Sequence, residues 1–132
     1  IYRTVAGSTS AVTPAGNWFY ADATFDSRRR RLICVREDHT QPEREPETAL
    51  VSIPVDGPES AGEVLASGHD FYSTPRLSPD GFMLSWLAWR HPQMPWDGTE
   101  LWTAHVGASG ALENATYERL PEHMQRPAQR AA

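Results

Sequence analysis

Cysteine is almost absent from this sequence, with Cys34 alone among 132 residues. A single cysteine excludes an internal disulfide and a cysteine-based zinc site. It lies in the apolar run 32–35, so we expect a buried and unreactive thiol rather than a nucleophile. The lack of a disulfide framework fits a reducing compartment, and we therefore expect a cytoplasmic protein.

Long apolar runs and an excess of positive charge are absent too. No stretch reaches 18 apolar residues, so we expect no transmembrane helix, and the first residues lack the charged start and apolar core of a signal peptide. The net charge is −5, which argues against nucleic acid because phosphate binding needs a basic face. We expect neither a nucleic acid nor a membrane as partner.

The one basic run is formed by the four arginines of residues 28–31. It falls where a turn leads into the next expected strand. Such a charge run is typical of a solvated hairpin turn, which is the interpretation we prefer. The alternative is a local contact with an anion such as phosphate.

What the sequence does contain is an internal repeat. Identical residues recur at an offset of 52: Gly16/Gly68, Phe19/Phe71, Tyr20/Tyr72, Leu32/Leu84 and His39/His91. A period of about 40–50 residues with strand-like content is typical of propeller blades. A propeller ring has about 4–8 blades, so a chain with about two blades is expected to be a fragment of a larger protein.

Short apolar runs separated by Gly, Pro, Asp and Ser predict an all-β chain. The expected strands are 2–5, 19–25, 31–37, 49–55, 63–66, 71–77, 82–89, 100–106 and 112–120. They predict about two four-stranded antiparallel blades, which is a partial β-propeller. We expect residues 1–16 to be the end of a preceding blade and a linker, 17–68 and 69–120 to be blades, and 121–132 to be a polar tail.

Two longer connections, 39–48 and 90–99, join the second and third strands of the two expected blades. Loops at equivalent positions of a repeat lie on one face, and such faces often bind ligands. Alternatively, the loops pack on each other or on a neighbouring domain. Both interpretations stay open at the level of sequence.

The second connection holds the candidate contact residues His91, Trp96 and Asp97. His91 repeats the position of His39, but no short metal-ligand spacing accompanies them, so we expect loop-capping histidines and no metal. Trp96 either packs over a turn formed by Asp97 or contacts a substrate or another domain. These three residues are our candidates for a substrate or interdomain contact.

The nucleophile elbow Gly-x-Ser-x-Gly of α/β-hydrolases is also missing. The nearest stretch, residues 107–110, lacks the spacing and is typical of a hairpin turn. We therefore assign no catalytic, cofactor-binding or metal-binding residue to this chain, and we expect no cofactor.

Two segments resemble known families. Residues 70–81, Asp-Phe-Tyr-Ser-Thr-Pro-Arg-Leu-Ser-Pro-Asp-Gly, resemble the blade repeat of TolB-like propellers (a WD-like repeat) and of prolyl oligopeptidase-type serine peptidases. Residues 84–102 are more specific and resemble the amino-terminal propeller of bacterial acylaminoacyl-peptidase-like enzymes of that family. Residues 34–39 and 50–57 fit the preceding blade. The resemblance covers roughly residues 1–108, and Gln93 departs from the asparagine expected there.

The resemblance implies a propeller of seven or eight blades over an α/β-hydrolase domain with a Ser-Asp-His triad. This chain would then be part of the propeller and would gate the access of short peptides to a hydrolase domain that it does not itself contain. Its partners would be that hydrolase domain and the peptide substrate. The alternatives are a non-enzymatic propeller that binds a peptide or protein, and an independent domain of two packed sheets.

Overall fold

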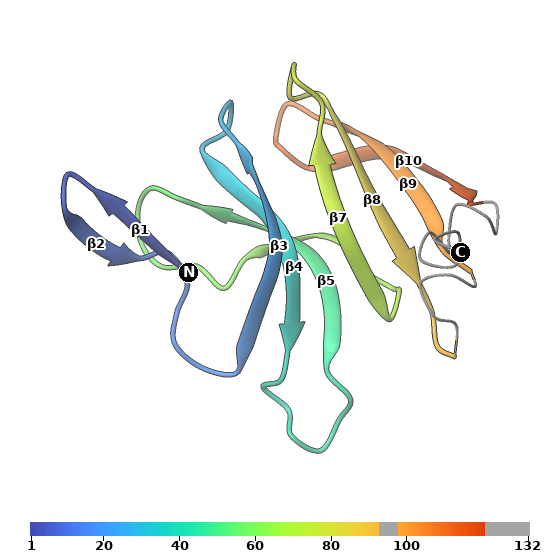
Figure 1. Cartoon of the computed structure of the whole chain (residues 1–132), viewed down its shortest axis with the longest axis horizontal. Coiled ribbons are helices and arrows are strands. Elements are labelled where there is room, and N and C mark those ends of the chain that lie inside the picture. Colours follow the sequence, from blue (N-terminus) through green and yellow to red (C-terminus); the bar gives the residue numbers. More distant parts are fainter. Residues whose placement is uncertain (93–97, 121–132) are drawn as a thin grey trace, which may run out of the picture.

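The computed structural model describes residues 1–92 and 98–120, which form ten β-strands and no helix (Figure 1). The all-β prediction is therefore confirmed. No helix of the described residues is long and apolar enough to cross a membrane.

Eight strands form two four-stranded antiparallel sheets, each with its strands in chain order. The first sheet contains β3 (Trp18–Asp26), β4 (Arg31–Asp38), β5 (Glu47–Pro54) and β6 (Glu63–Ala66). The second contains β7 (Phe71–Leu77), β8 (Met83–Trp89), β9 (Glu100–Val106) and β10 (Leu112–Arg119). Two such meanders are the partial propeller-like fold that the sequence predicts.

A separate hairpin precedes the sheets and consists of β1 (Tyr2–Val5) and β2 (Ser8–Ala11). The sequence predicts β1 but not β2, because Ser-Thr-Ser-Ala lacks the alternating apolar pattern of a strand. The two-residue turn between them explains the pairing. Ala6 and Gly7 both have positive φ, 50° and 82°, as a type I′ hairpin turn requires.

The main core lies between the facing sides of the two sheets. Strand β8 shows how the side chains are sorted: Leu84, Trp86 and Ala88 are buried, and the residues between them are half-buried. Side chains alternate between the two faces of a strand, so the buried set faces the first sheet. There it packs against Ile33 and Leu50.

Cys34 belongs to a second, smaller cluster on the opposite side of the first sheet, where Val12 covers it together with Val51 and Ile53. Its side chain is fully buried, and this burial raises the pKa of the thiol to about 11. The expectation of a buried thiol is confirmed.

Because the thiol is buried and protonated at neutral pH, we expect Cys34 to react with a disulfide reagent such as DTNB only after unfolding. The measurement is the rate of thiol release in native buffer and in concentrated urea. Full release in native buffer within the time that the unfolded chain needs would contradict this prediction.

The arginine run corrects the sequence-based interpretation. Arg29 and Arg31 do not lie in solvent, because both guanidinium groups bind the fully buried carboxylate of Asp26, at 3.1 and 3.0 Å. Burial by itself would raise the pKa of Asp26, but the hydrogen bonds from Arg31 and Arg29 outweigh it and hold this pKa below its ordinary value. The run is neither a solvated turn nor a free anion contact at these two positions.

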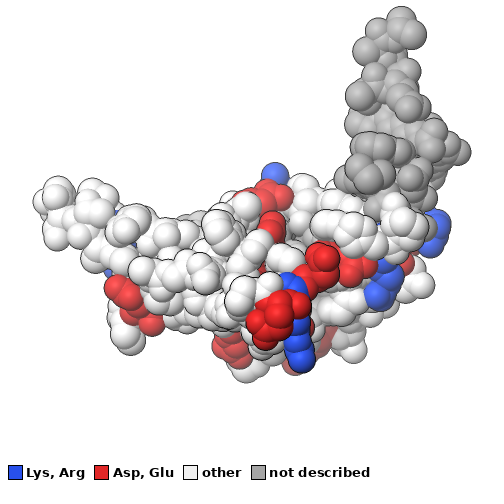
Figure 2. Space-filling view, turned by 90° about the horizontal axis from the view of Figure 1, so that it is seen from below, with Lys and Arg blue, Asp and Glu red and all other residues white. Residues whose placement is uncertain are grey.

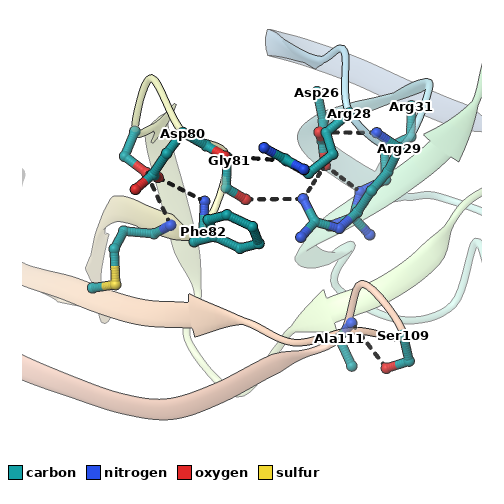
Figure 3. Close-up of polar contacts among 11 residues, drawn as sticks. Asp26, Arg28, Arg29, Arg31, Asp80, Gly81, Phe82, Ser109 and Ala111 are labelled. Atoms are coloured by element: carbon teal, nitrogen blue, oxygen red, sulfur yellow. Dashed lines mark hydrogen bonds and ion pairs between the residues drawn. The ribbon is translucent and has the colours of Figure 1, made fainter.

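Arg28 and Arg29 of the same run join the two sheets, as Figure 3 shows. Arg29 donates to the carbonyl oxygen of Gly81 at 2.9 Å, and Arg28 donates to that of Asp80 at 3.2 Å. The guanidinium group of Arg28 also lies 4.6 Å from the ring centroid of Phe82, a cation–π contact. We call Asp26, Arg28, Arg29 and Arg31 the arginine clamp, since together they tie the first turn of one sheet to the equivalent turn of the other.

The first strands of the two sheets, β3 and β7, are joined at equivalent positions of the repeat. The pairing of β3 with β4 and of β7 with β8 is interrupted between Ala21 and Thr24 and between Ser73 and Arg76. In these bulges Asp22 and Thr74 have φ of 58° and 55°. The carboxylate of Asp22 accepts the backbone N–H of Thr74 at 2.5 Å, across 52 residues. The repeat thus places equivalent residues of the two sheets in direct contact.

Candidate functional site

One end of the two sheets carries the connection between β4 and β5 and the first residues after β8. In a four-stranded antiparallel meander, the first strand begins and the fourth strand ends at the end where the second and third strands are joined. The connection 39–46, residues 90–92 after β8 and the link 67–70 between the sheets therefore lie at this end, at the bottom of Figure 1. We call this end the loop face.

His39 and His91 occupy equivalent places on the loop face. The ring of His39 packs edge-on against Phe19 at 4.6 Å between centroids, and the ring of His91 packs edge-on against Phe71 at 4.7 Å. The backbone N–H of His91 donates to Asp70 at 2.8 Å, which fixes the start of its connection to the start of β7. Both histidines thus lie where a strand turns into a connection.

A metal site does not assemble around these histidines. Within residues 1–92 and 98–120, no group of three His, Cys, Asp or Glu side chains is placed to hold an ion. His39 instead lies 3.0 Å from the carboxylate of Glu37. The other two candidate contact residues, Trp96 and Asp97, lie outside the described residues.

A depression of about 580 Å³ lies beside His91, and we call it the inner depression. Three aromatic residues are among those that line it: the buried Tyr72, and Phe71 and Trp89, whose ring centroids lie 5.4 Å apart. Carboxylates line its walls: Glu37, Glu45 and Asp70. Figure 2, seen from the side of the loop face, shows carboxylate side chains gathered over the middle of this face.

A second depression of about 600 Å³, the middle depression, adjoins the first and shares Glu45 and Asp70 with it. Asp38 and Glu47 add two further carboxylates to its lining. The one arginine in its lining, Arg36, is held elsewhere: its guanidinium donates to the carbonyl oxygens of residues 61 and 62 at 3.1 and 3.3 Å. Acidic groups therefore dominate this part of the face.

A third depression of about 240 Å³ leads outward between β6 and the second sheet, and we call it the outer depression. It shares Ser67 and His69 with the middle depression. Most of its lining is apolar: Leu65, Ala66, Trp86, Trp102, Leu112 and Ala115. An apolar pocket with a few polar groups at one end is the usual form of a small binding site.

The polar end of the outer depression is a fixed hydrogen-bond network. Glu100 accepts from the indole N–H of Trp102 at 3.0 Å and lies 2.8 Å from Nε2 of His69. The backbone N–H of His69 donates to the hydroxyl of Tyr72 at 3.2 Å. Only 9% of the His69 side chain and 15% of the Glu100 side chain is exposed. This network fixes the link between the sheets against the second sheet.

Sequence reasoning identified His91 but missed the residues around it. Trp89, for example, stacks on Phe71 with 5.4 Å between the ring centroids, next to His91. Glu45 lies in the connection between β4 and β5, Asp70 lies in the link between the sheets, and no motif links them. The repeat was the available signal, because it placed Phe71 and His91 at the positions of Phe19 and His39.

The chain is similar to solved peptidase structures. One is a puromycin hydrolase, with 34% identity over 87% of this chain and a TM-score of 0.74. Another is a serine-to-alanine variant of puromycin hydrolase complexed with PGG, with 35% identity over 87% of the chain and a TM-score of 0.76. A third is a puromycin-hydrolyzing peptidase of Mycobacterium tuberculosis, with 34% identity over 84% and a TM-score of 0.73.

No protein-family model matches the chain, and no curated protein matches it either. The chain spans about a fifth of the length of the solved structures, since it covers 19% of each. Identity above 30% over most of this chain, together with the agreement in fold, confirms the resemblance to a peptidase propeller that the sequence predicted.

Proposed function

We propose that this chain, as part of the propeller of a prolyl oligopeptidase-family serine peptidase, restricts which peptides reach an α/β-hydrolase domain of the same parent protein. In this proposal, residues 17–68 and 69–120 are successive blades, and residues 1–16 are the end of a preceding blade and a linker. The observation that carries the proposal is the similarity to puromycin-hydrolyzing peptidases over both sheets.

The far side of the second sheet supports the proposal that a further blade packs against it. Its core-facing side packs on the first sheet, while its other side exposes the half-buried Leu87 and Leu101. These residues repeat the positions of Val35 and Leu50, at offsets of 52 and 51, and both of those residues belong to the core between the sheets. The far side of the second sheet is thus equivalent to the side of the first sheet that packs against the second sheet.

The topology supports the loop face as the side of the hydrolase domain. The chain enters each sheet at β3 or β7 and leaves it at β6 or β10, always at the loop face. A domain that precedes or follows the propeller in the same chain is therefore joined to it at this face. A peptide that approaches through the ring would pass the inner strands and then the loop face.

The full-length parent protein provides the test. We expect a fluorophosphonate probe to label it, because an α/β-hydrolase serine would react. We then expect a variant with residues 41–45 replaced by a short glycine-serine link to cleave longer peptides with a higher kcat/KM, while kcat/KM for the shortest substrate stays unchanged.

The two readouts separate the two candidate functions. A parent protein that the probe does not label would support the non-enzymatic propeller, whose loop face binds a peptide or protein partner. If the probe labels the enzyme but the loop replacement leaves its preference for peptide length unchanged, the gating role is contradicted and the peptidase assignment stays in place.

A further inference from the structure

The outer depression is an opening of the core between the two sheets, at their outer strands. Strand β6 has four residues whereas β9 and β10 have seven and eight, so β6 does not cover the whole facing side of the second sheet. Leu65 and Ala66 of β6 form one wall, and Trp102 and Leu112 of the second sheet form the other. All four pack against the core but are only partly buried.

Two tryptophans give this opening a flat apolar wall. Trp86 and Trp102 are directly opposite each other in the pairing of β8 with β9, and their rings stack with planes 7° apart. The depression has a volume of about 240 Å³, which is larger than the cavity of about 150 Å³ that holds benzene in a protein core. It therefore has room for one substituted aromatic ring, but not for a folded segment.

His69 belongs to the wall of the same depression. Only 9% of its side chain is exposed, and its ring packs edge-on against the rings of Tyr72 and Trp102, at 5.7 Å between centroids in both cases. Tyr72 and Trp102 line the outer depression and do not line the middle one. Nε2 of His69 lies 2.8 Å from the carboxylate of Glu100. A carboxylate only accepts, so Nε2 carries the hydrogen of this bond.

The second ring nitrogen of His69, Nδ1, has no partner. It makes no hydrogen bond with the described residues, yet it is not among their enclosed side-chain atoms that lack a partner, which are Arg31 Nη2 and Arg36 Nε. It is therefore open to a molecule from outside. In the neutral ring with a hydrogen on Nε2, Nδ1 is an acceptor. An unpaired acceptor in an otherwise mostly apolar lining favours a ligand that brings a single donor.

We propose that the outer depression binds a small free aromatic molecule, a single ring that carries a hydroxyl or amino group. Its ring packs against Trp86 and Trp102, and its O–H or N–H donates to Nδ1 of His69. Most of the lining is apolar and offers few partners for the amide groups of a peptide backbone, which favours a free molecule.

This site goes beyond the proposed gating role. A peptide that enters through a ring passes the first strands, β3 and β7, whereas the outer depression lies at the third and fourth strands. Because its walls come from both sheets, a molecule bound there contacts both of them.

The direct test is the binding of phenol to this 132-residue chain. Toluene is the matched comparison, because it has the same size but no O–H. Amide chemical shifts of residues 65, 66 and 112 locate the site and give the affinities. We expect phenol to bind with a Kd of about 1 mM, which the ligand efficiency of so small a molecule allows. We expect toluene to bind about fivefold more weakly, as the loss of one neutral hydrogen bond predicts.

A second readout follows the acceptor itself. The long-range ¹H–¹⁵N spectrum of the imidazole rings shows which nitrogen of His69 carries the hydrogen. We expect the Nδ1 resonance to move upfield when phenol binds and to stay in place with toluene. This measurement uses the unaltered chain, so it does not depend on whether a variant folds.

Variants assign the two contacts. Ala115 is an exposed residue of β10 that lines the depression, and we expect Ala115→Phe to fill it and to weaken phenol binding at least about tenfold. Thr116→Phe is the matched control, because Thr116 is exposed on the same strand but does not line the depression. We expect His69→Phe to reduce the affinity for phenol to that for toluene. Thermal melts show that each variant is folded before affinities are compared.

Equal affinities for phenol and toluene would overturn the inference, as would an Nδ1 that already carries a hydrogen in the free chain. Equal effects of Ala115→Phe and Thr116→Phe, or no binding of phenol up to about 10 mM, would overturn it too. Tighter binding of N-acetyltyrosinamide than of phenol would overturn the free molecule as occupant and indicate a tyrosine side chain of another protein instead. The proposed gating role is tested separately, by the loop replacement in the parent protein.

Discussion

Replacing Asp26 by alanine is expected to destabilise the chain by about 3–5 kcal/mol, the usual cost of removing one partner from a buried ion pair. The carboxylate is fully buried, and it is the group that neutralises Arg31, whose side chain is only 10% exposed. One nitrogen of Arg31, Nη2, is already buried without a hydrogen-bond partner among the described residues. Without Asp26, the rest of this guanidinium would lose its counter-charge as well.

The expected loss is a large share of the stability of a small domain, which is about 5–15 kcal/mol. Urea unfolding followed by tryptophan fluorescence measures it. The control is Asp56→Ala, because Asp56 pairs with Arg30 and Arg3 at the surface with 52% of its side chain exposed. We expect this control to leave the midpoint unchanged, since exposed ion pairs contribute little. Similar losses in both variants would show that the arginine clamp has no special role.

The pH dependence gives a second readout of the same carboxylate. The pKa of Asp26 is lowered in the folded chain relative to its value of 3.8 in the unfolded chain. Its contribution to stability is therefore fully present above about pH 4 and is lost as the pH falls through the lowered folded pKa. We expect the difference in stability between the wild type and Asp26→Asn to shrink in this acidic range. A difference that grows towards low pH would contradict the assigned sign.

The sequence predicted the strands well where apolar residues alternate with polar ones. The expected strands 63–66, 71–77 and 100–106 agree with β6, β7 and β9. It failed where the pairing depends on turn geometry, as in the hairpin of β1 and β2, whose strands are mostly polar. It also failed for the arginine run, because the partner of Arg31 is a carboxylate five positions earlier, on the neighbouring strand, whose burial no local pattern shows.

The candidate site was predicted only in part, and for a similar reason. His91 was visible because the repeat singles it out. Glu45 and Asp70 line the same depression only because the two sheets pack side by side, and a pattern within one strand contains no such information. The outer depression depends on Trp102, which a sequence pattern presents simply as a buried aromatic residue of a strand.

The second large effect is expected for Leu84→Ala, with a loss of about 2–5 kcal/mol in the free energy of unfolding. Leu84 is fully buried between the sheets, and its removal leaves a cavity that the neighbouring strands can fill only partly. Leu84→Val removes less volume and is expected to cost about 1 kcal/mol, so it reports on the same site if the alanine variant does not fold.

Leu87→Ala is the matched control, because Leu87 lies on the same strand but on the opposite, half-buried side. In this chain we expect it to cost about 1 kcal/mol or less, since little apolar surface leaves water at this position. In the full-length parent protein we expect the cost of Leu87→Ala to rise towards that of Leu84→Ala, because a further blade would bury it as the second sheet buries Val35. The same small cost in both proteins would show that no blade packs there, whereas a large cost in this chain alone would mean that a second copy covers this side.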